Sequence, residues 1–137
     1  MTLVFLGEVP DGKVQAAREA GEVQRTGCFS LRFERWEHWA GARAVVASTS
    51  DRPEPLMTLR AGLAAGLTQR GVAFDDKPLR PHITVARKLT QAPVLPELSE
   101  FSCTLRAFSL VSSVTAPTGS VYTVVDTWPL LDTAARS

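Results

Sequence analysis

The chain has 137 residues, a formal net charge of +1 and 45% hydrophobic residues, which excludes a disordered chain and gives no global basic field for nucleic-acid binding. Its two cysteines, Cys28 and Cys103, lie far apart and favour a reducing compartment over a disulfide framework. No apolar run approaches the roughly 20 residues that a membrane span needs, and the first residues lack the basic leader of a signal peptide. We therefore expect one soluble, cytoplasmic domain over residues 1–137 with no membrane association.

The first part of the chain predicts strands and one helix. Residues 29–34 alternate apolar and polar side chains, which is typical of a half-buried strand. The helix is predicted by the apolar spacing of Val14, Ala17 and Ala20. The expected elements, in chain order, are a strand over residues 2–6, a helix capped by Asp11 and ended by Gly27, a strand over 29–34, a polar turn flanked by Trp36 and Trp39 and closed by Gly41, and a strand over 44–48.

The second part predicts a long helix and then more strands. Four leucines recur at helical spacing between Pro55 and Arg70, and Gly71 is well placed to end that helix. The remaining expected elements are a charged loop over residues 75–81, a strand over 82–87, an irregular stretch over 91–99, and two antiparallel strands over 101–113 and 121–128 joined by a turn. This order of strands and helices predicts an α+β fold, with helices packed on antiparallel sheets.

The segment with the clearest chemistry runs from Arg80 to Arg87. Residues two apart in a strand project from the same face, so His82 and Thr84 are expected to point together into a groove, with Ile83 and Val85 buried behind them. An imidazole can transfer a proton near neutral pH, and a hydroxyl can donate to a phosphate oxygen. Alone, a His-x-Thr pattern is more often an ordinary pair of strand residues.

The surrounding residues make the pattern more specific. The sequence Pro81-His82-Ile83-Thr84-Val85-Ala86-Arg87 resembles the second motif of the 2H phosphoesterases, in particular the RNA 2′,3′-cyclic phosphodiesterases, also called the LigT-like or 2′-5′ RNA ligase group. The opening Thr2-Leu3-Val4-Phe5-Leu6-Gly7 is similar to the end of the first motif of that family, with Thr2 on its threonine. The family pattern places the first motif's histidine just before Met1, and a strand and helix before that, so the resemblance implies a bilobal fold that is N-terminally truncated.

The resemblance also implies a reaction. In the family, two facing His-x-Thr strands hydrolyse a ribose 2′,3′-cyclic phosphate to a 2′-phosphate, with one histidine activating water and the other protonating the 3′ oxygen, and with no metal or other cofactor. Carried onto this chain, the catalytic residues are His82, Thr84 and Thr2. The substrate-binding residues are Arg87, Arg80 and Phe5. Arg87 needs a bulge or a strand end to reach the site, because a regular strand puts it on the face of Ile83.

Three functions and the oligomeric state remain open. The chain can be a phosphodiesterase for RNA ends, an inactive RNA- or nucleotide-binding module that keeps the groove, or a phosphodiesterase for another cyclic phosphate, such as ADP-ribose 1″,2″-cyclic phosphate. An open strand edge predicts a homodimer. Lys77 and Lys88 flank the motif as solvated charges or as contacts along an RNA path. His38 matches no family motif and is interpreted as a turn residue beside Trp36 and Trp39.

Overall fold

The computed structural model describes residues 1–132 and has an α+β architecture. A helix, three strands, a second helix and four strands follow one another, and the α+β class agrees with the prediction. In chain order the elements are a short 3₁₀ helix (Asp11–Lys13), α1 (Val14–Glu22), β1 (Phe29–Phe33), β2 (Arg35–Trp39), β3 (Ala44–Ser48), α2 (Glu54–Gln69), β4 (His82–Ala86), β5 (Phe101–Leu105), β6 (Ala107–Ala116) and β7 (Gly119–Pro129).

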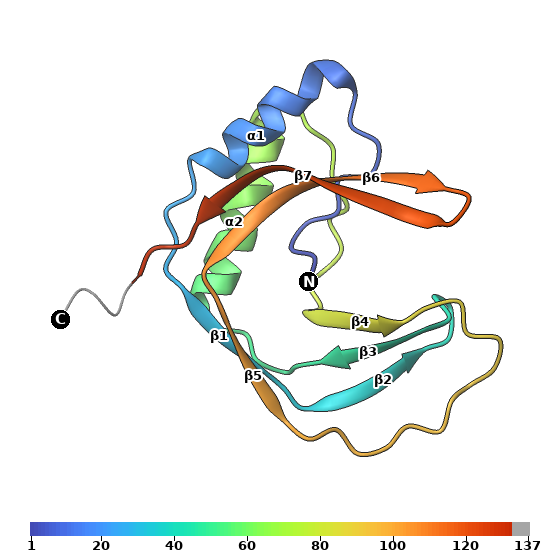
Figure 1. The fold of residues 1–137 in the computed structure, drawn as a ribbon. Coiled ribbons are helices and arrows are strands. Elements are labelled where there is room, and N and C mark those ends of the chain that lie inside the picture. The colour runs from blue at the N-terminus through green and yellow to red at the C-terminus, as the bar shows by residue number, and fades with distance from the viewer. Residues whose placement is uncertain (133–137) are drawn as a thin grey trace.

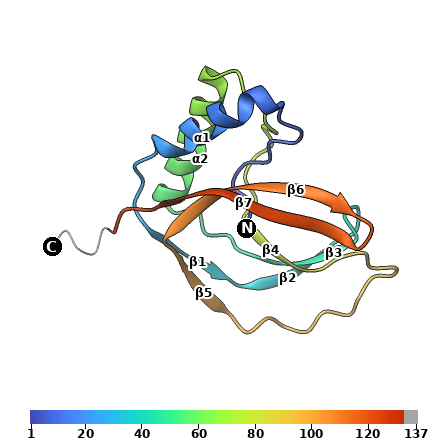
Figure 2. The ribbon, with the colours of Figure 1, turned by 45° about the horizontal axis from the view of Figure 1, so that its top comes forward.

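The strands form three antiparallel sheets. β2, β3 and β4 make one sheet in that order, β1 pairs with β5, and β6 pairs with β7 in a long two-stranded ribbon. Both helices lie together outside the sheets (Figure 1). The ribbon crosses over the β2–β3–β4 sheet, and the N-terminus lies between the ribbon and β4 in both views (Figure 2). Two layers therefore face each other across the start of the chain.

The main hydrophobic core joins β1 and β3 to α2. The alternation predicted for residues 29–34 is present, since Phe29, Leu31 and Phe33 are buried while the residues between them are exposed. Leu56 and Leu59 of α2 are fully buried against these strands. Burying a large apolar side chain contributes about 1.5–3 kcal/mol, so this cluster fixes the sheets relative to α2.

A second cluster packs α1 on α2. Ala17 and Ala20 carry the apolar stripe of α1 and meet Leu67 of α2. Gly66 permits the close approach, because a Cβ there would lie 3.3 Å from Ala20 Cβ. α2 ends as predicted: Gly71 adopts φ of +68°, the left-handed conformation that glycine favours after a helix C-terminus.

Three strand and turn predictions are wrong. Residues 2–6 form no strand, because their backbone does not join a ladder; the Asp75 amide instead donates to the Phe5 carbonyl at 2.8 Å. Trp36 and Trp39 do not flank a turn but lie on β2, and the turn follows at residues 40–43. The strand expected over 101–113 is two strands, since the chain leaves β1 after Leu105 and pairs with β7 from Ala107.

The predicted start of α1 also differs in detail. Asp11 is the first residue of the 3₁₀ helix and not its N-cap, which is Pro10. The helix ends at Glu22, earlier than the predicted stop at Gly27. Gly21, close to this end, lies against Trp128 of β7, where a Cβ would come within 2.6 Å of the indole ring.

Candidate active site

β4 carries the predicted His-x-Thr pair on one face of its sheet. Across the antiparallel ladder, Ser48 lies opposite His82 and Val46 lies opposite Thr84, while Ala47 lies opposite Ile83. Because successive strand residues alternate between faces, His82 and Thr84 share one face and Ile83 lies on the other. Ile83 packs against the main core but is only partly buried, so the expectation that it is buried holds in part.

A bulge in β4 changes which face the following residues occupy. The ladder shifts between Val45 and Val46, so that Thr84 and Ala86 are paired with consecutive β3 residues and Val85 is the extra residue. An extra residue reverses the alternation beyond it, which returns Arg87 to the face of Thr84. The bulge also leaves Val85 53% exposed, so the prediction that Val85 is buried behind the site is wrong.

The imidazole of His82 is anchored by the backbone. Its Nδ1 lies 2.6 Å from the carbonyl oxygen of Arg80. A carbonyl can only accept a hydrogen bond, so Nδ1 carries the proton in this contact and Nε2 is the nitrogen left for proton transfer. This arrangement has the form of a general acid or base whose second nitrogen is held by a fixed acceptor.

The face of His82 and Thr84 opens on a cavity of about 310 Å³. We call it the threonine cavity, because Thr2 and Thr84 both line it. The lining residues are Met1, Thr2, His82, Ile83, Thr84, Arg87 and Tyr122. The structure thus brings together Thr2, the His82–Thr84 pair and Arg87 from distant parts of the sequence. One imidazole, two hydroxyls and a guanidinium around a small cavity are suited to an anion.

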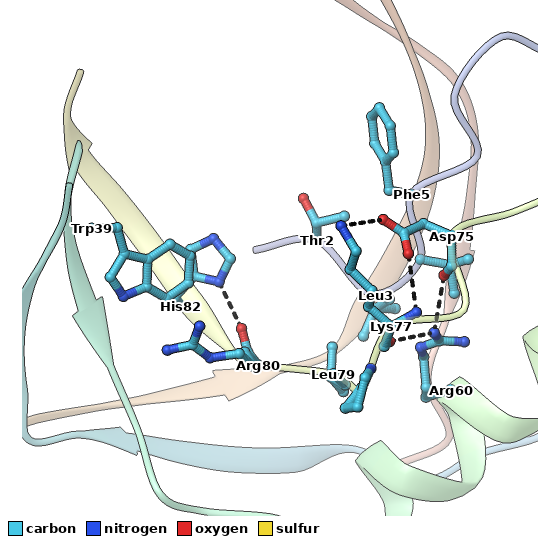
Figure 3. A pocket seen from close by; sticks show the side chains of 12 residues that line it. Thr2, Leu3, Phe5, Trp39, Arg60, Asp75, Lys77, Leu79, Arg80 and His82 are labelled. Carbon is cyan, nitrogen blue, oxygen red and sulfur yellow. Dashed lines mark hydrogen bonds and ion pairs between the residues drawn. The ribbon is translucent and has the colours of Figure 1, made fainter. Parts of the chain in front are cut away.

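A second cavity of about 330 Å³ shares Thr2 and His82 with the first. We call it the tryptophan cavity, since Trp39 forms one wall (Figure 3). Its lining residues are Thr2, Leu3, Val4, Phe5, Trp39, Arg60, Asp75, Lys77, Pro78, Leu79, Arg80 and His82. Phe5 is 65% exposed there, so its ring is accessible. Two of the three predicted substrate-binding residues, Phe5 and Arg80, line this cavity. The third, Arg87, lines the threonine cavity.

Charged groups line the far wall of the tryptophan cavity. Arg60 of α2 donates to the backbone carbonyls of Asp75 and Lys77 at 3.4 and 3.2 Å, and the Lys77 ammonium lies 3.8 Å from the Asp75 carboxylate. Arg80, at the Trp39 end of the cavity, is paired with Glu37 at 3.9 Å. The cavity thus has the cations Arg60, Lys77 and Arg80 in its lining, against the carboxylates of Asp75 and of the neighbouring Glu37. Lys88, by contrast, lines neither cavity.

Two aromatic residues of the site were missed in the sequence. The sequence pattern predicts only that Trp39 flanks a turn, yet its ring centroid lies 4.3 Å from that of His82. Tyr122 of β7 borders the threonine cavity beside Thr2. No short motif marks either residue. Trp39 is brought to the site by the pairing of β2 in the sheet, and Tyr122 by the β6–β7 ribbon that lies over β4. His38 lies on β2, not in a turn, and lines neither cavity.

The α+β fold and a His-x-Thr strand above a polar cavity define a chain of the 2H phosphoesterase class. A family model described as the 2′-5′ RNA ligase superfamily matches residues 1–116. The chain belongs to this family of phosphoesterases.

Curated relatives carry a common name. An Escherichia coli protein named RNA 2′,3′-cyclic phosphodiesterase is 30% identical over 132 residues, which cover 95% of this chain and 74% of that protein. A Thermus thermophilus protein of the same name is 34% identical over 149 residues, covering 95% of this chain and 71% of the relative. Both alignments span almost all of the present chain.

Solved structures agree with the fold. The structure of Escherichia coli LigT complexed with 3′-AMP matches with a TM-score of 0.82 at 28% identity, over 94% of this chain and 75% of that chain. A Thermus thermophilus structure matches with a TM-score of 0.81 at 29% identity, over 96% of this chain and 78% of that chain. LigT has also been solved complexed with phosphate, and that structure matches with a TM-score of 0.75 at 29% identity, over 94% of this chain and 73% of that chain.

Proposed function

We propose that this chain is an RNA 2′,3′-cyclic phosphodiesterase that hydrolyses 2′,3′-cyclic phosphate ends to 2′-phosphates. The observation that carries the proposal is the threonine cavity, where the His82–Thr84 pair of β4 meets Thr2 from the other end of the chain. The names of the two curated relatives support the same activity. Within this site His82, Thr84 and Thr2 are the proposed catalytic residues.

The proposed chemistry uses His82, Thr84, Thr2 and Arg87 of this chain together with water. The cyclic phosphate sits in the threonine cavity, with its non-bridging oxygens accepting from the hydroxyls of Thr2 and Thr84 and with Arg87 balancing its charge. Water adds to phosphorus and loses a proton, the bond to the 3′ oxygen breaks, and that oxygen takes a proton. His82 carries one of these two protons through Nε2, because Nδ1 is held by the Arg80 carbonyl, and solvent water carries the other. The product keeps its phosphate on the 2′ oxygen.

The nucleoside that bears the phosphate is proposed to occupy the tryptophan cavity. The cavity has a volume of about 330 Å³ and adjoins the phosphate site through Thr2 and His82. The exposed ring of Phe5 can stack on a base, and base–aromatic stacking contributes about 1–3 kcal/mol. Arg80 can pair with a phosphate of the RNA chain.

Two further features of the protein are proposals. Cytoplasmic localisation is supported by Cys28 and Cys103, which are both free thiols. None of the helices within residues 1–132 has the length and apolar character needed to cross a membrane. A homodimer is supported by the β6–β7 ribbon, whose exposed apolar side chains are Val111, Val114, Val121, Tyr122, Val124 and Val125. Sedimentation that finds only monomer at high concentration contradicts the dimer.

A substrate panel tests the activity and separates the alternatives. The chain is incubated with 2′,3′-cyclic AMP, with an RNA oligonucleotide ending in a 2′,3′-cyclic phosphate, and with ADP-ribose 1″,2″-cyclic phosphate. We expect the two 2′,3′-cyclic substrates to yield 2′-phosphates and the third to react more slowly. Binding of the oligonucleotide without turnover identifies a binding module instead. Faster turnover of the ADP-ribose compound assigns a different substrate to the site.

A further inference from the structure

The indole of Trp39 is in direct contact with the imidazole of the proposed catalytic histidine. The two ring centroids lie 4.3 Å apart with planes inclined at 53°. The guanidinium carbon of Arg80 lies 4.5 Å from the centroid of the same indole. Figure 3 shows the three side chains gathered at one end of the tryptophan cavity. Trp39 therefore contacts both His82 and the residue whose carbonyl binds His82.

The sheet register places Trp39 on the same face of the sheet as His82. Arg35 pairs with Ser48, and Ser48 pairs with His82, so these three residues share a face of the sheet. Trp39 lies four residues after Arg35 on β2 and, by alternation, is on the same face. Trp36 lies on the opposite face, where it packs against the main core. The two tryptophans of β2 thus have different surroundings.

The hydrogen bond to the Arg80 carbonyl does not by itself prevent the imidazole from rotating. The last side-chain torsion of histidine is broad, and His82 is only half buried, so water competes for its Nδ1 proton. A rotation of the ring would exchange the two nitrogens between the Arg80 carbonyl and the cavity. A bulky neighbour at 4.3 Å blocks part of that rotation.

We propose that Trp39 is a positioning residue, which holds the His82 imidazole so that Nδ1 stays on the Arg80 carbonyl and Nε2 faces the threonine cavity. Arg80 acts on both partners, since its carbonyl accepts from His82 while its guanidinium stacks on Trp39. The Glu37 carboxylate, 3.9 Å from that guanidinium, keeps the cation in place. The expected effect of Trp39 on the reaction rate rests on the proposed phosphodiesterase activity.

The direct test is the tautomer of His82, read from nitrogen-15 spectra of the imidazoles. The chain has only two histidines, so the His38→Asn variant assigns both signals. The wild type is expected to show His82 with the proton on Nδ1 in its neutral form. Trp39→Phe, with a smaller ring, is expected to lose part of this preference, and Trp39→Leu is expected to show averaged nitrogens. Trp36→Phe is the matched control on the other face of β2 and should leave the His82 signals unchanged.

The kinetic arm uses 2′,3′-cyclic AMP. Misplacement of a catalytic group by about 1 Å can cost about a hundredfold, so Trp39→Leu should lower kcat about tenfold to a hundredfold while KM changes little. Wild-type spectra and kcat in folded Trp39→Leu overturn the proposal. If that variant does not fold, Trp39→Phe decides: a reduced Nδ1–H preference supports the proposal and a wild-type pattern overturns it. If the wild type does not hydrolyse the nucleotide, the proposed function fails, and the spectra still decide the role of Trp39.

Discussion

Thr84 and Arg87 line the same cavity although Arg87 comes three residues after Thr84. A regular strand would put them on opposite faces, and the bulge at Val85 removes that conflict. The sequence alone predicts that Arg87 needs such an irregularity to reach the site. The bulge thus joins a hydroxyl and a cation around one proposed phosphate position.

Replacing Arg87 should weaken anion binding. Hydrogen bonds to charged groups contribute about 1.5–3 kcal/mol, so Arg87→Met should raise the Kd of inorganic phosphate about tenfold to a hundredfold. Shifts of the His82 nitrogen-15 signals during a phosphate titration measure this Kd. Lys88→Met is the matched control, since Lys88 is the next residue and lines neither cavity. Equal Kd values for Arg87→Met and the wild type would remove Arg87 from the site.

The hydroxyl of Thr84 should act on substrate and not on folding. Thr84→Val keeps the shape of the side chain and removes its donor to the phosphate, so we expect kcat/KM for 2′,3′-cyclic AMP to fall about tenfold to a hundredfold. Thermal unfolding should be little changed, because valine is favoured in strands. Thr115→Val on exposed β6 is the control. A variant at residue 84 with the wild-type rate contradicts the assignment.

Packing of α1 on β7 predicts a stability effect far from the cavities. A Cβ at Gly21 would lie 2.6 Å from the ring of Trp128, so the indole has to move in Gly21→Ala. Overpacking of this kind costs about 1–3 kcal/mol of unfolding free energy. At Gly12 a Cβ meets nothing within 4 Å, so Gly12→Ala should be neutral or slightly stabilising. Denaturant unfolding of both variants measures the difference, and equal stabilities would contradict it.

Glu34 should make stability depend on acid pH. The Ser50 hydroxyl and the Ser50 amide, the latter at 2.6 Å, donate to Glu34 Oε1 and hold its pKa below the ordinary 4.5, with the charges of Arg32 and Arg35 adding to this. A carboxylate with a lowered folded-state pKa stabilises the fold above its unfolded pKa, and this contribution disappears as pH falls through the folded value.

The matching experiment compares Glu34→Gln with the wild type across pH. We expect the variant to be less stable above pH 4.5, and the difference to shrink as the pH is lowered further. Glu8→Gln, at an exposed residue, is the control and should follow the wild type. A stability difference that stays constant with pH shows that the Ser50 contacts do not depend on the charge of Glu34.

Local patterns in the sequence predict the elements that are stabilised by their own periodicity. The alternation around Leu31 and the leucine spacing in α2 both identify buried faces correctly, and the pairing of His82 with Thr84 follows from strand geometry alone. Residues 2–6 are different, because a strand pattern becomes a strand only where a neighbour accepts its hydrogen bonds. Trp39 and Tyr122 belong to the site through register and through the ribbon, which are long-range properties that no local spacing contains.

The hydrolysis of 2′,3′-cyclic AMP, followed by phosphorus-31 spectra, tests the paired-histidine account most directly. The family motif places a histidine just before Met1, so two versions of the chain are compared, preceded by Gly-Ser-His and by Gly-Ser-Asn. General acid–base groups contribute about a hundredfold to ten-thousandfold, and we expect the histidine version to be faster by such a factor, with 2′-AMP as product. The chain without added residues should be about as slow as the asparagine version. In the histidine version, His82→Ala should abolish the increase in rate that the added histidine gives. Equal rates for the two extended versions, or an unchanged rate in His82→Ala, would contradict the account.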